Sequence, residues 1–188
     1  MNDLWIDFVN SDYHDHRGQA PHRDHLAEPE WIAEFLRKRG LPAVDARAPA
    51  VRSGLQALRS QLMETVQSLI KENRVRPAHL KALNQYLAAR PVISRLEMQD
   101  EEFRLRLAPD ASGLDAVNFA IAESFAGFLV EGDPTRLKAC ENPDCGWVFY
   151  DTTRSRTRRW CADTCGNLIK VRRFRQEKSR SNRGKRRG

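Results

Sequence analysis

Four cysteines near the carboxyl end carry the clearest chemical signal in the sequence. They are spaced Cys140-x4-Cys145-x15-Cys161-x3-Cys165, so that two close pairs are separated by a gap the size of a hairpin. A tetrahedral zinc ion takes four deprotonated sulfur ligands at about 2.3 Å, and two tight turns can each supply two of them. The spacing therefore predicts one structural Zn²⁺ held by these four residues.

Disulfide bonds or unrelated buried thiols are the alternatives to a metal. The chain starts Met1-Asn2-Asp3-Leu4, without the basic and apolar regions of a signal peptide, and no apolar run approaches the ~18 residues of a membrane span. We therefore expect a cytoplasmic protein that does not act at a membrane, and disulfides are rare in that compartment. Four thiolates also leave zinc no open position for water, so we expect no enzymatic role.

The positive charge of the chain is concentrated in the segment that contains the cysteines. The formal net charge of +7 divides into +11 for residues 136–188 and −4 for residues 1–135. A localised basic block is typical of a protein that binds a polyanion. The predicted nucleic-acid contacts are the cations between and just after the cysteine pairs: Arg154, Arg156, Arg158, Arg159, Lys170, Arg172, Arg173 and Arg175.

DNA, bound through its phosphates, is the expected partner of these cations. RNA and an acidic protein are alternatives because the same charges attract any polyanion. Trp147 and Trp160 could stack on bases, but packing against the zinc hairpin is the more common use of such residues. A thiol redox switch that releases zinc on oxidation is a further alternative. A homodimer is also left open.

A histidine-rich loop at residues 10–27 offers a second set of metal ligands and would suit a metalloenzyme. Loop histidines are more often solvated, and no two histidines in this loop have the i, i+4 spacing of a helical metal site. The residues concerned are Asp12, His14, Asp15, His16, His22, Asp24 and His25.

The segments that must position the cysteines are predicted to form a short strand followed by a helix. Residues 147–150 (Trp-Val-Phe-Tyr) favour a strand between the two cysteine pairs. Apolar residues then recur every three positions from Leu168 to Phe174, which predicts a helix that begins at the second pair. We expect this helix to pack on the zinc hairpin and to present Lys170 and Arg173 outward.

The longer amino-terminal part of the chain has the periodicity of a helix-rich domain. Apolar and polar residues alternate over 92–107 around an acidic turn, which predicts a hairpin with one solvent-facing side. Residues 4–9 fit a strand or a turn of helix about equally. Helices are predicted over residues 29–39, 51–69, 77–87 and 113–131.

The expected fold class is α+β. A helix-rich domain with a small β-hairpin occupies residues 1–135 and serves for regulation, ligand binding or dimerisation. A small four-cysteine zinc module, a β-hairpin followed by a helix, occupies residues 136–177. The last residues, 178–188, contain six basic residues and no acidic or apolar side chains, which predicts a disordered basic tail.

The cysteine segment resembles the bacterial CGNR zinc-finger family. The matching residues are Asp151-Thr152-Thr153-Arg154, Arg158-Arg159-Trp160-Cys161 and Cys165-Gly166-Asn167-Leu168. The residues Asp7-Phe8-Val9-Asn10 and the helical remainder resemble ABATE, the amino-terminal domain of that family. The resemblance implies a candidate stress-induced transcription regulator. Leu168 stands in place of the arginine that gives the family its name, and Ser155 in place of an expected asparagine, while the zinc ligands are unaffected.

Overall fold

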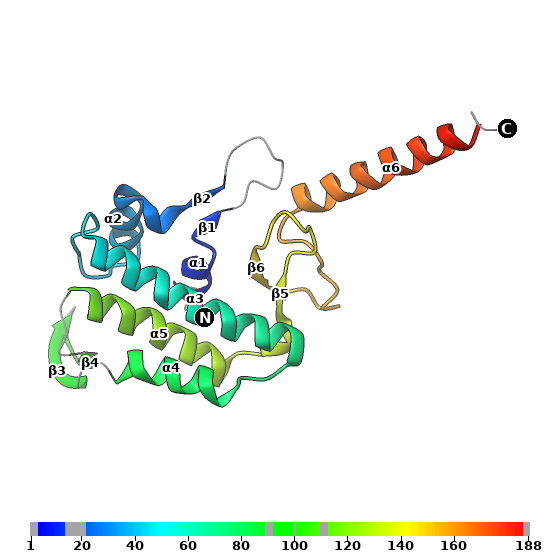
Figure 1. The fold of residues 1–188 in the computed structure, drawn as a ribbon. Coiled ribbons are helices and arrows are strands. Elements are labelled where there is room, and N and C mark those ends of the chain that lie inside the picture. Colours follow the sequence, from blue (N-terminus) through cyan, green and yellow to red (C-terminus); the bar gives the residue numbers. More distant parts are fainter. Residues whose placement is uncertain (1–3, 14–21, 89–91, 100, 110–112, 186–188) are drawn as a thin grey trace. The chain divides into compact units, whose positions relative to one another are not determined.

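The computed structural model describes residues 4–13, 22–88, 92–99, 101–109 and 113–185. The chain divides into two compact units, each described separately below (Figure 1). Unit 1 takes in Met1–Asp12 and Asp24–Thr135, and unit 2 takes in Tyr13–Arg23 and Arg136–Gly188. The two-residue strands β1 (Asp12–Tyr13) and β2 (Arg23–Asp24) pair with each other where the chain passes between the units.

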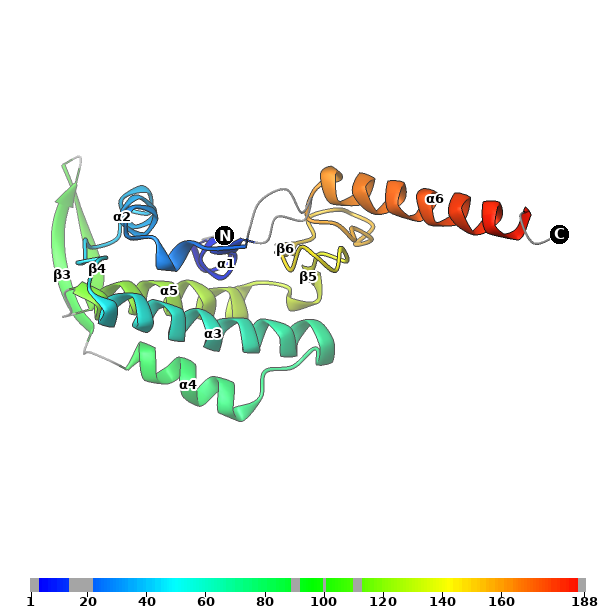
Figure 2. The ribbon, with the colours of Figure 1, turned by 45° about the horizontal axis from the view of Figure 1, so that its top comes forward.

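Unit 1 is built mainly from helices. They are α1 (Leu4–Val9), η1 (His25–Ala27), α2 (Pro29–Lys38), α3 (Pro49–Glu72), α4 (Pro77–Leu87), α5 (Gly113–Glu131) and η2 (Pro134–Arg136). Helices α3, α4 and α5 lie side by side, and α1 packs against both α3 and α5 (Figure 2). The helices predicted from the apolar periodicity are therefore confirmed.

The first helix, α1, is the element for which the sequence allowed either a strand or a helix. Its buried residues are Leu4, Trp5, Phe8 and Val9, a spacing that lies on one face of a helix. A strand would have placed Trp5 and Val9 on the same side as Asp7. Trp5 packs against Phe125 of α5, with ring centroids 4.9 Å apart, so the demand for one buried apolar face decides the conformation.

Helix α5 forms the centre of unit 1. By length and composition it could cross a membrane, but half of its apolar window is buried among the other elements. Phe125 and Ile121 are fully buried, as is Leu58 of the neighbouring helix α3. Helices at the core of globular proteins show this same combination of apolar composition and burial.

A polar network ties the chain that follows α1 to helix α3. Arg59 donates two hydrogen bonds to the Asp24 carboxylate, at 2.6 and 2.8 Å, and a third to the Ser11 hydroxyl at 3.0 Å. Asp24 also accepts hydrogen bonds from the Gln56 side chain and from the Leu26 amide at the start of η1. Burial tends to raise the pKa of Asp24, but the hydrogen bonds and charge of Arg59 outweigh it and lower the pKa.

The predicted hairpin is present in unit 1 as β3 (Val92–Gln99) and β4 (Glu102–Pro109). The strands are antiparallel, and their register pairs Leu96 with Leu105 and Met98 with Phe103. These four side chains therefore share one face of the ribbon, and they are 68–73% exposed.

Unit 2 contains a second short hairpin and a long helix. Strand β5 (Leu137–Ala139) is antiparallel to β6 (Val148–Tyr150), with Lys138 opposite Phe149. Helix α6 (Asp163–Lys185) begins between the third and fourth cysteines, as predicted. The α+β class is confirmed by the helices of unit 1 together with the small antiparallel sheets and the cysteine cluster.

Helix α6 differs from the prediction in two respects. It continues to Lys185, so residues 178–185 are helical where a disordered tail is predicted. Four of these eight residues are Lys or Arg, which favour a helix, no proline interrupts the segment, and a helix that is already formed adds further residues at little cost. Its apolar stripe is also largely uncovered: Val171 and Phe174 are 45% and 66% exposed, because the zinc hairpin is too short to cover more than the first turns.

Candidate zinc centre and nucleic-acid interface

The four cysteines of unit 2 converge at one point. Cys140 follows β5 directly, Cys145 precedes β6, and Cys161 and Cys165 flank the start of α6. Their sulfur atoms all lie within 4.8 Å of one another, and none of the thiols is in a disulfide. Among the residues that the structure describes, this is the one group of metal-ligating side chains gathered so closely.

The separation of the sulfur atoms fits a single zinc ion. A tetrahedron with zinc–sulfur bonds of about 2.3 Å has an edge of about 3.8 Å. The Sγ atoms of Cys145 and Cys161 are 3.6 Å apart, and those of Cys161 and Cys165 are also 3.6 Å apart. A disulfide would bring two sulfurs to about 2.05 Å. The donor set and its spacing therefore fit one structural Zn²⁺, as the sequence predicts.

Backbone hydrogen bonds build the turn that carries the first cysteine pair. The amide of Cys140 donates to the Trp147 carbonyl at 2.8 Å, and the amide of Cys145 donates to the Asn142 carbonyl at 3.0 Å. The buried Asn142 side chain lies 3.7 Å from the Cys165 sulfur, to which its amide donates. It therefore links the two cysteine pairs directly and orients a ligand.

Each of the two glycines that follow a cysteine pair has a different reason to be glycine. Gly146 has a φ of +66°, the left-handed conformation that glycine adopts without strain. Gly166 lies in helix α6, and a Cβ atom there would come within 2.9 Å of the Trp160 ring. Close packing, and not a positive φ, accounts for Gly166.

The protonation of the thiols is consistent with a site that needs a cation. Burial raises the pKa of Cys145 to about 12, and burial also raises the pKa of Cys161. For Cys140, burial is outweighed by backbone hydrogen bonds from Cys161 and Asn142, and its pKa is lowered. A bound dication would compensate the charge of four clustered thiolates, and its binding would release their protons.

The two tryptophans of the zinc unit pack against the metal site. Trp147 and Trp160 are partly buried around a cluster formed by Cys140, Cys145, Cys165 and Phe149. They therefore help to enclose the sulfur atoms, which is the packing role expected for them.

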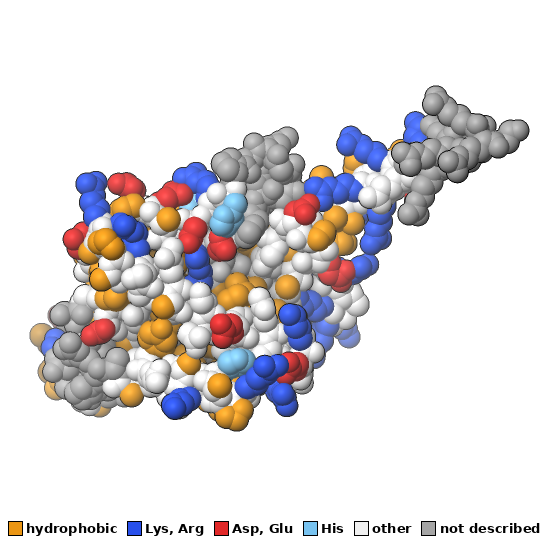
Figure 3. All heavy atoms as spheres, viewed as in Figure 1, with side chains coloured by type: hydrophobic (Ala, Val, Ile, Leu, Met, Phe, Trp, Pro, Cys, Tyr) orange, Lys and Arg blue, Asp and Glu red, His pale blue; other side chains and the backbone are white. Residues whose placement is uncertain are grey.

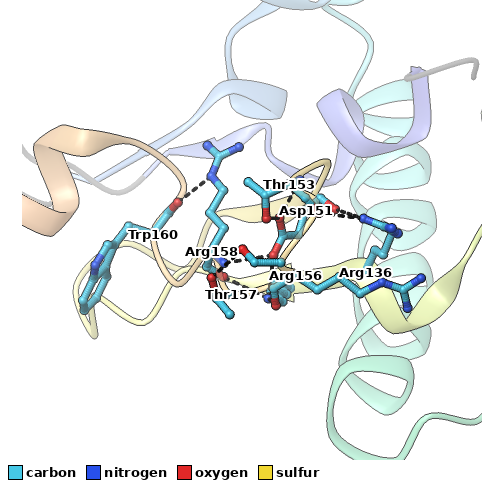
Figure 4. Close-up of polar contacts among 9 residues, drawn as sticks. Arg136, Asp151, Thr153, Arg156, Thr157, Arg158 and Trp160 are labelled. Carbon is cyan, nitrogen blue, oxygen red and sulfur yellow. Dashed lines mark hydrogen bonds and ion pairs between the residues drawn. The ribbon is translucent and has the colours of Figure 1, made fainter.

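A fully buried carboxylate, Asp151, organises the chain between β6 and the second cysteine pair (Figure 4). One oxygen accepts hydrogen bonds from the Thr153 amide at 3.0 Å and the Thr153 hydroxyl at 2.6 Å. The other accepts from the Arg158 amide at 3.0 Å and the Lys138 ammonium at 2.7 Å. These hydrogen bonds, with that of Lys138 the largest influence, lower the pKa of Asp151, so it is ionised at neutral pH.

Lys138 of strand β5 and Arg136, the last residue of η2, extend this network. The Lys138 ammonium also donates to the backbone carbonyls of Arg156 and Arg158. Arg136 donates to the carbonyls of Asp151 and Thr153, each at 3.0 Å. The segment from Asp151 to Arg158 is thus fixed by side chains at several backbone positions. Sequence reasoning missed these residues, although Asp-Thr-Thr is a recognisable turn signal.

Arg158, one of the predicted nucleic-acid contacts, is directed inward. It is half-buried, its guanidinium donates to the carbonyls of Trp160 (2.9 Å) and Cys161, and it lies 4.8 Å from the centre of the Phe149 ring. Arg158 therefore stabilises the zinc unit from within.

Two further predicted contacts are paired with acidic side chains of the first cysteine turn. Arg159 binds Glu141 and lies 5.3 Å from the centre of the Trp160 ring. Arg172 of α6 binds Asp144. The remaining predicted contacts are all exposed: Arg154, Arg156, Lys170, Arg173 and Arg175.

The alternative metal site in the histidine-rich loop receives no support from the residues that can be described. Asp24 is held by Arg59, and the His25 ring stacks on Trp31 with a centroid distance of 5.0 Å. His14, Asp15 and His16 lie outside the described residues.

Two family profiles match the chain. The profile of ABATE, described as "Putative stress-induced transcription regulator", matches residues 2–132. The chain belongs to the ABATE family. The profile of the CGNR zinc finger matches residues 136–178, which contain the four cysteines and the Asp151 network. Both matches confirm the resemblance predicted from the residues. No curated protein matches the chain at a significant level.

Membership of the ABATE family and the geometry of unit 2 agree on what the cysteines are for. The CGNR match identifies the segment as a zinc finger, and the sulfur cluster has the composition and spacing of one structural Zn²⁺. With four sulfur donors the ion has a filled coordination shell, and its effect is to hold the β5–β6 hairpin against the first turn of α6.

Proposed function

We propose that the chain is a cytoplasmic transcription regulator that binds DNA through unit 2. Cys140, Cys145, Cys161 and Cys165 bind one zinc ion, and the ordered unit places arginine and lysine side chains against duplex phosphates. Residues 1–135 form the regulatory or dimerising domain, residues 136–177 form the zinc finger, and the basic residues after 177 add further positive charge.

The observation that carries this proposal is the position of the exposed cations on the zinc-braced scaffold. Arg154 and Arg156 lie on the loop held by Asp151, and Lys170, Arg173 and Arg175 lie along α6. Figure 3 shows Lys and Arg side chains following the described part of this helix. Cations fixed on a rigid element lose less entropy when they meet phosphates than cations on a flexible chain.

The experiment is a salt titration of duplex binding by the full-length, zinc-loaded chain. If the five exposed cations each contact a phosphate, log Kobs falls with log[salt] at a slope of about −4.5, which weakens binding roughly 500-fold between 50 and 200 mM salt. Random-sequence DNA of about 30 base pairs is the probe, with fluorescence anisotropy as the readout. A slope near zero would refute phosphate contact.

Matched probes separate DNA from the other polyanions. Structured RNA and polyglutamate are titrated at the same salt concentrations as the duplex. Tighter binding to the RNA would assign the zinc unit to RNA, and preference for polyglutamate would assign it to an acidic protein. Equal affinity for the duplex, the RNA and polyglutamate would leave only nonspecific charge attraction.

The spacing of the thiols makes a redox switch the second candidate. The Cys145–Cys161 and Cys161–Cys165 sulfur pairs are close enough for a disulfide to form after zinc leaves. Peroxide treatment of the loaded chain, followed by zinc release with a colorimetric chelator, tests it. Release at peroxide concentrations that leave methionine intact supports the switch, and retained zinc excludes it.

A further inference from the structure

The loop between β6 and the second cysteine pair is held in an unusual backbone conformation. Arg156 has a φ of +54°, a left-handed conformation that costs a non-glycine residue about 1 kcal/mol and persists only when its surroundings enforce it. This conformation is enforced by a hydrogen bond from the Lys138 ammonium to the carbonyl of Arg156. Lys138 is in turn held 2.7 Å from the buried Asp151 carboxylate.

The loop buries the carboxylate that anchors it, that of Asp151, but leaves its arginines exposed. Asp151 is fully buried, while Thr152, Arg154 and Arg156 around it are exposed. The anchor therefore contributes a negative charge that a ligand at the surface cannot reach. Its contacts are with the Thr153 amide and hydroxyl and the Arg158 amide (Figure 4), and with the Lys138 ammonium. These contacts determine the path of the backbone that carries Arg154 and Arg156.

We propose that Asp151 is a positioning residue for nucleic-acid binding: acting through Lys138 and the loop backbone, it fixes Arg154 and Arg156 for contact with phosphates. This inference rests on the proposed function of unit 2. It gives an acidic residue a favourable role in binding a polyanion, which is the opposite of what its charge alone predicts.

Charge alone and positioning predict changes in DNA affinity of opposite sign, and this difference can be tested. Asp151→Asn and Asp144→Asn each remove one negative charge from unit 2, and Asp144 is an exposed carboxylate that binds Arg172. Charge alone predicts that both variants bind duplex DNA more tightly. Positioning predicts that D151N binds more weakly while D144N binds as tightly as the wild type or more tightly. If D151N also tightens binding, the proposal is wrong.

The magnitude follows from the two arginines concerned. Loss of two phosphate contacts lowers the salt slope by about 1.8 and weakens binding roughly 30-fold at 0.15 M salt. In an Arg154→Ala/Arg156→Ala background, D151N should have no further effect on the affinity, because its action passes through those side chains. An equal loss in that background would show a general structural role and would overturn the proposal.

Two further measurements keep the outcome clear. Amide hydrogen exchange at residues 153–158 should accelerate in D151N while zinc remains bound, and this readout does not depend on DNA. If D151N loses its zinc, Thr153→Val, which removes one hydrogen bond to Asp151 without a change in charge, replaces it in the same titrations. A wild-type chain that fails to bind any duplex overturns the proposed function, whereas unchanged exchange in the variant overturns the role of Asp151.

The β3–β4 hairpin of unit 1 carries a second, independent inference. One face of the ribbon presents Leu96, Met98, Phe103 and Leu105, all mostly exposed. The other face is charged, with Glu97 opposite Arg104 and within 3.8 Å of Arg106. A two-stranded ribbon is marginally stable alone and is normally completed by something that covers its apolar face.

We infer that a second copy of this chain covers the apolar face, stacking ribbon on ribbon. With 68–73% of each side chain exposed, the four residues offer roughly 600 Å², the upper end of what monomers expose in one patch. Two such faces about 10 Å apart bury roughly 1,200 Å² in total, the lower limit for a specific interface. Because all four side chains of the patch are apolar, it can pack against the same patch of a second copy related by a two-fold axis, and both charged faces then stay in water.

Sedimentation velocity of the zinc-loaded chain between 1 and 100 µM tests the inference without DNA. The wild type should be a dimer, and Leu96→Ser/Phe103→Ser should be a monomer with unchanged helix content by circular dichroism. Glu97→Ser/Arg104→Ser, on the opposite face and without change in net charge, is the matched control and should stay dimeric. A wild-type monomer at 100 µM, or a dimer that survives the apolar substitutions, would refute it.

Discussion

Arg158 and Arg154 are four residues apart in one basic loop, yet the structure predicts that their loss has different effects. Truncation of Arg158 to alanine leaves the carbonyls of Trp160 and Cys161 without their donor and removes the cation from the Phe149 ring. Hydrogen bonds from charged groups contribute about 1.5–3 kcal/mol each when well shielded, and for a half-buried side chain we take about 2 kcal/mol in all.

That cost should appear as weaker zinc binding. Because metal binding and folding of a small zinc unit are one process, 2 kcal/mol corresponds to a zinc dissociation constant about 30-fold higher. Arg154→Ala removes an exposed side chain, so its zinc affinity should be that of the wild type. Its salt slope for duplex binding should instead fall by about 0.9, the contribution of one phosphate contact.

Two titrations distinguish the variants. Competition with a colorimetric zinc chelator gives the zinc affinity, and anisotropy at several salt concentrations gives the slope once each variant is saturated with zinc. If Arg158→Ala bound zinc normally and lost a full phosphate contact, Arg158 would be a surface contact after all. The interpretation of its inward hydrogen bonds would then be wrong.

Three other outcomes are expected. Removal of zinc with EDTA takes away about 10–16 kcal/mol of binding free energy, which is as much as the whole stability of an ordinary domain. Amide hydrogen exchange should therefore show unit 2 unfolded and the helices of unit 1 still protected. Protection of both units would contradict this. Gly166→Ala should weaken zinc binding by about 1–3 kcal/mol through the clash with Trp160, whereas Gly127→Ala, whose Cβ meets nothing within 4 Å on helix α5, should stabilise unit 1 by about 0.5–1 kcal/mol in denaturant titrations. The pKa of Asp24 is lowered in the folded state, so on acidification the unfolded state takes up this proton at a higher pH than the folded state does. The unfolding free energy of unit 1 should therefore fall as the pH drops below about 4. Arg59→Met should flatten that dependence.

The features that the sequence predicts correctly are those set by residues close together in the chain. The cysteine spacing predicts the zinc site because each tight turn supplies two ligands from a few residues. The apolar periodicity of α3 predicts its buried face for the same reason, since residues three and four apart lie together on a helix. The α+β class and the family follow from these local patterns.

The features that it does not predict depend on contacts between distant segments. Asp151 meets Lys138 only because β5 and β6 pair in one register, and residue types do not reveal that register. Arg158 looks like its neighbours in the sequence, and only the three-dimensional position of the Trp160 and Cys161 carbonyls turns it inward. The conformation of residues 4–9 was likewise decided by packing against Phe125 of α5.

Because Cys165 lies in the first turn of α6, the zinc ion holds one end of a helix that is about 34 Å long. Without zinc, a segment so rich in like charges would lose the nucleus from which the helix propagates. Its cations would then lie on a flexible chain that must become ordered each time it binds a phosphate. The affinity for a nucleic acid would then depend on the concentration of free zinc in the cell, even if no cation in the segment were altered.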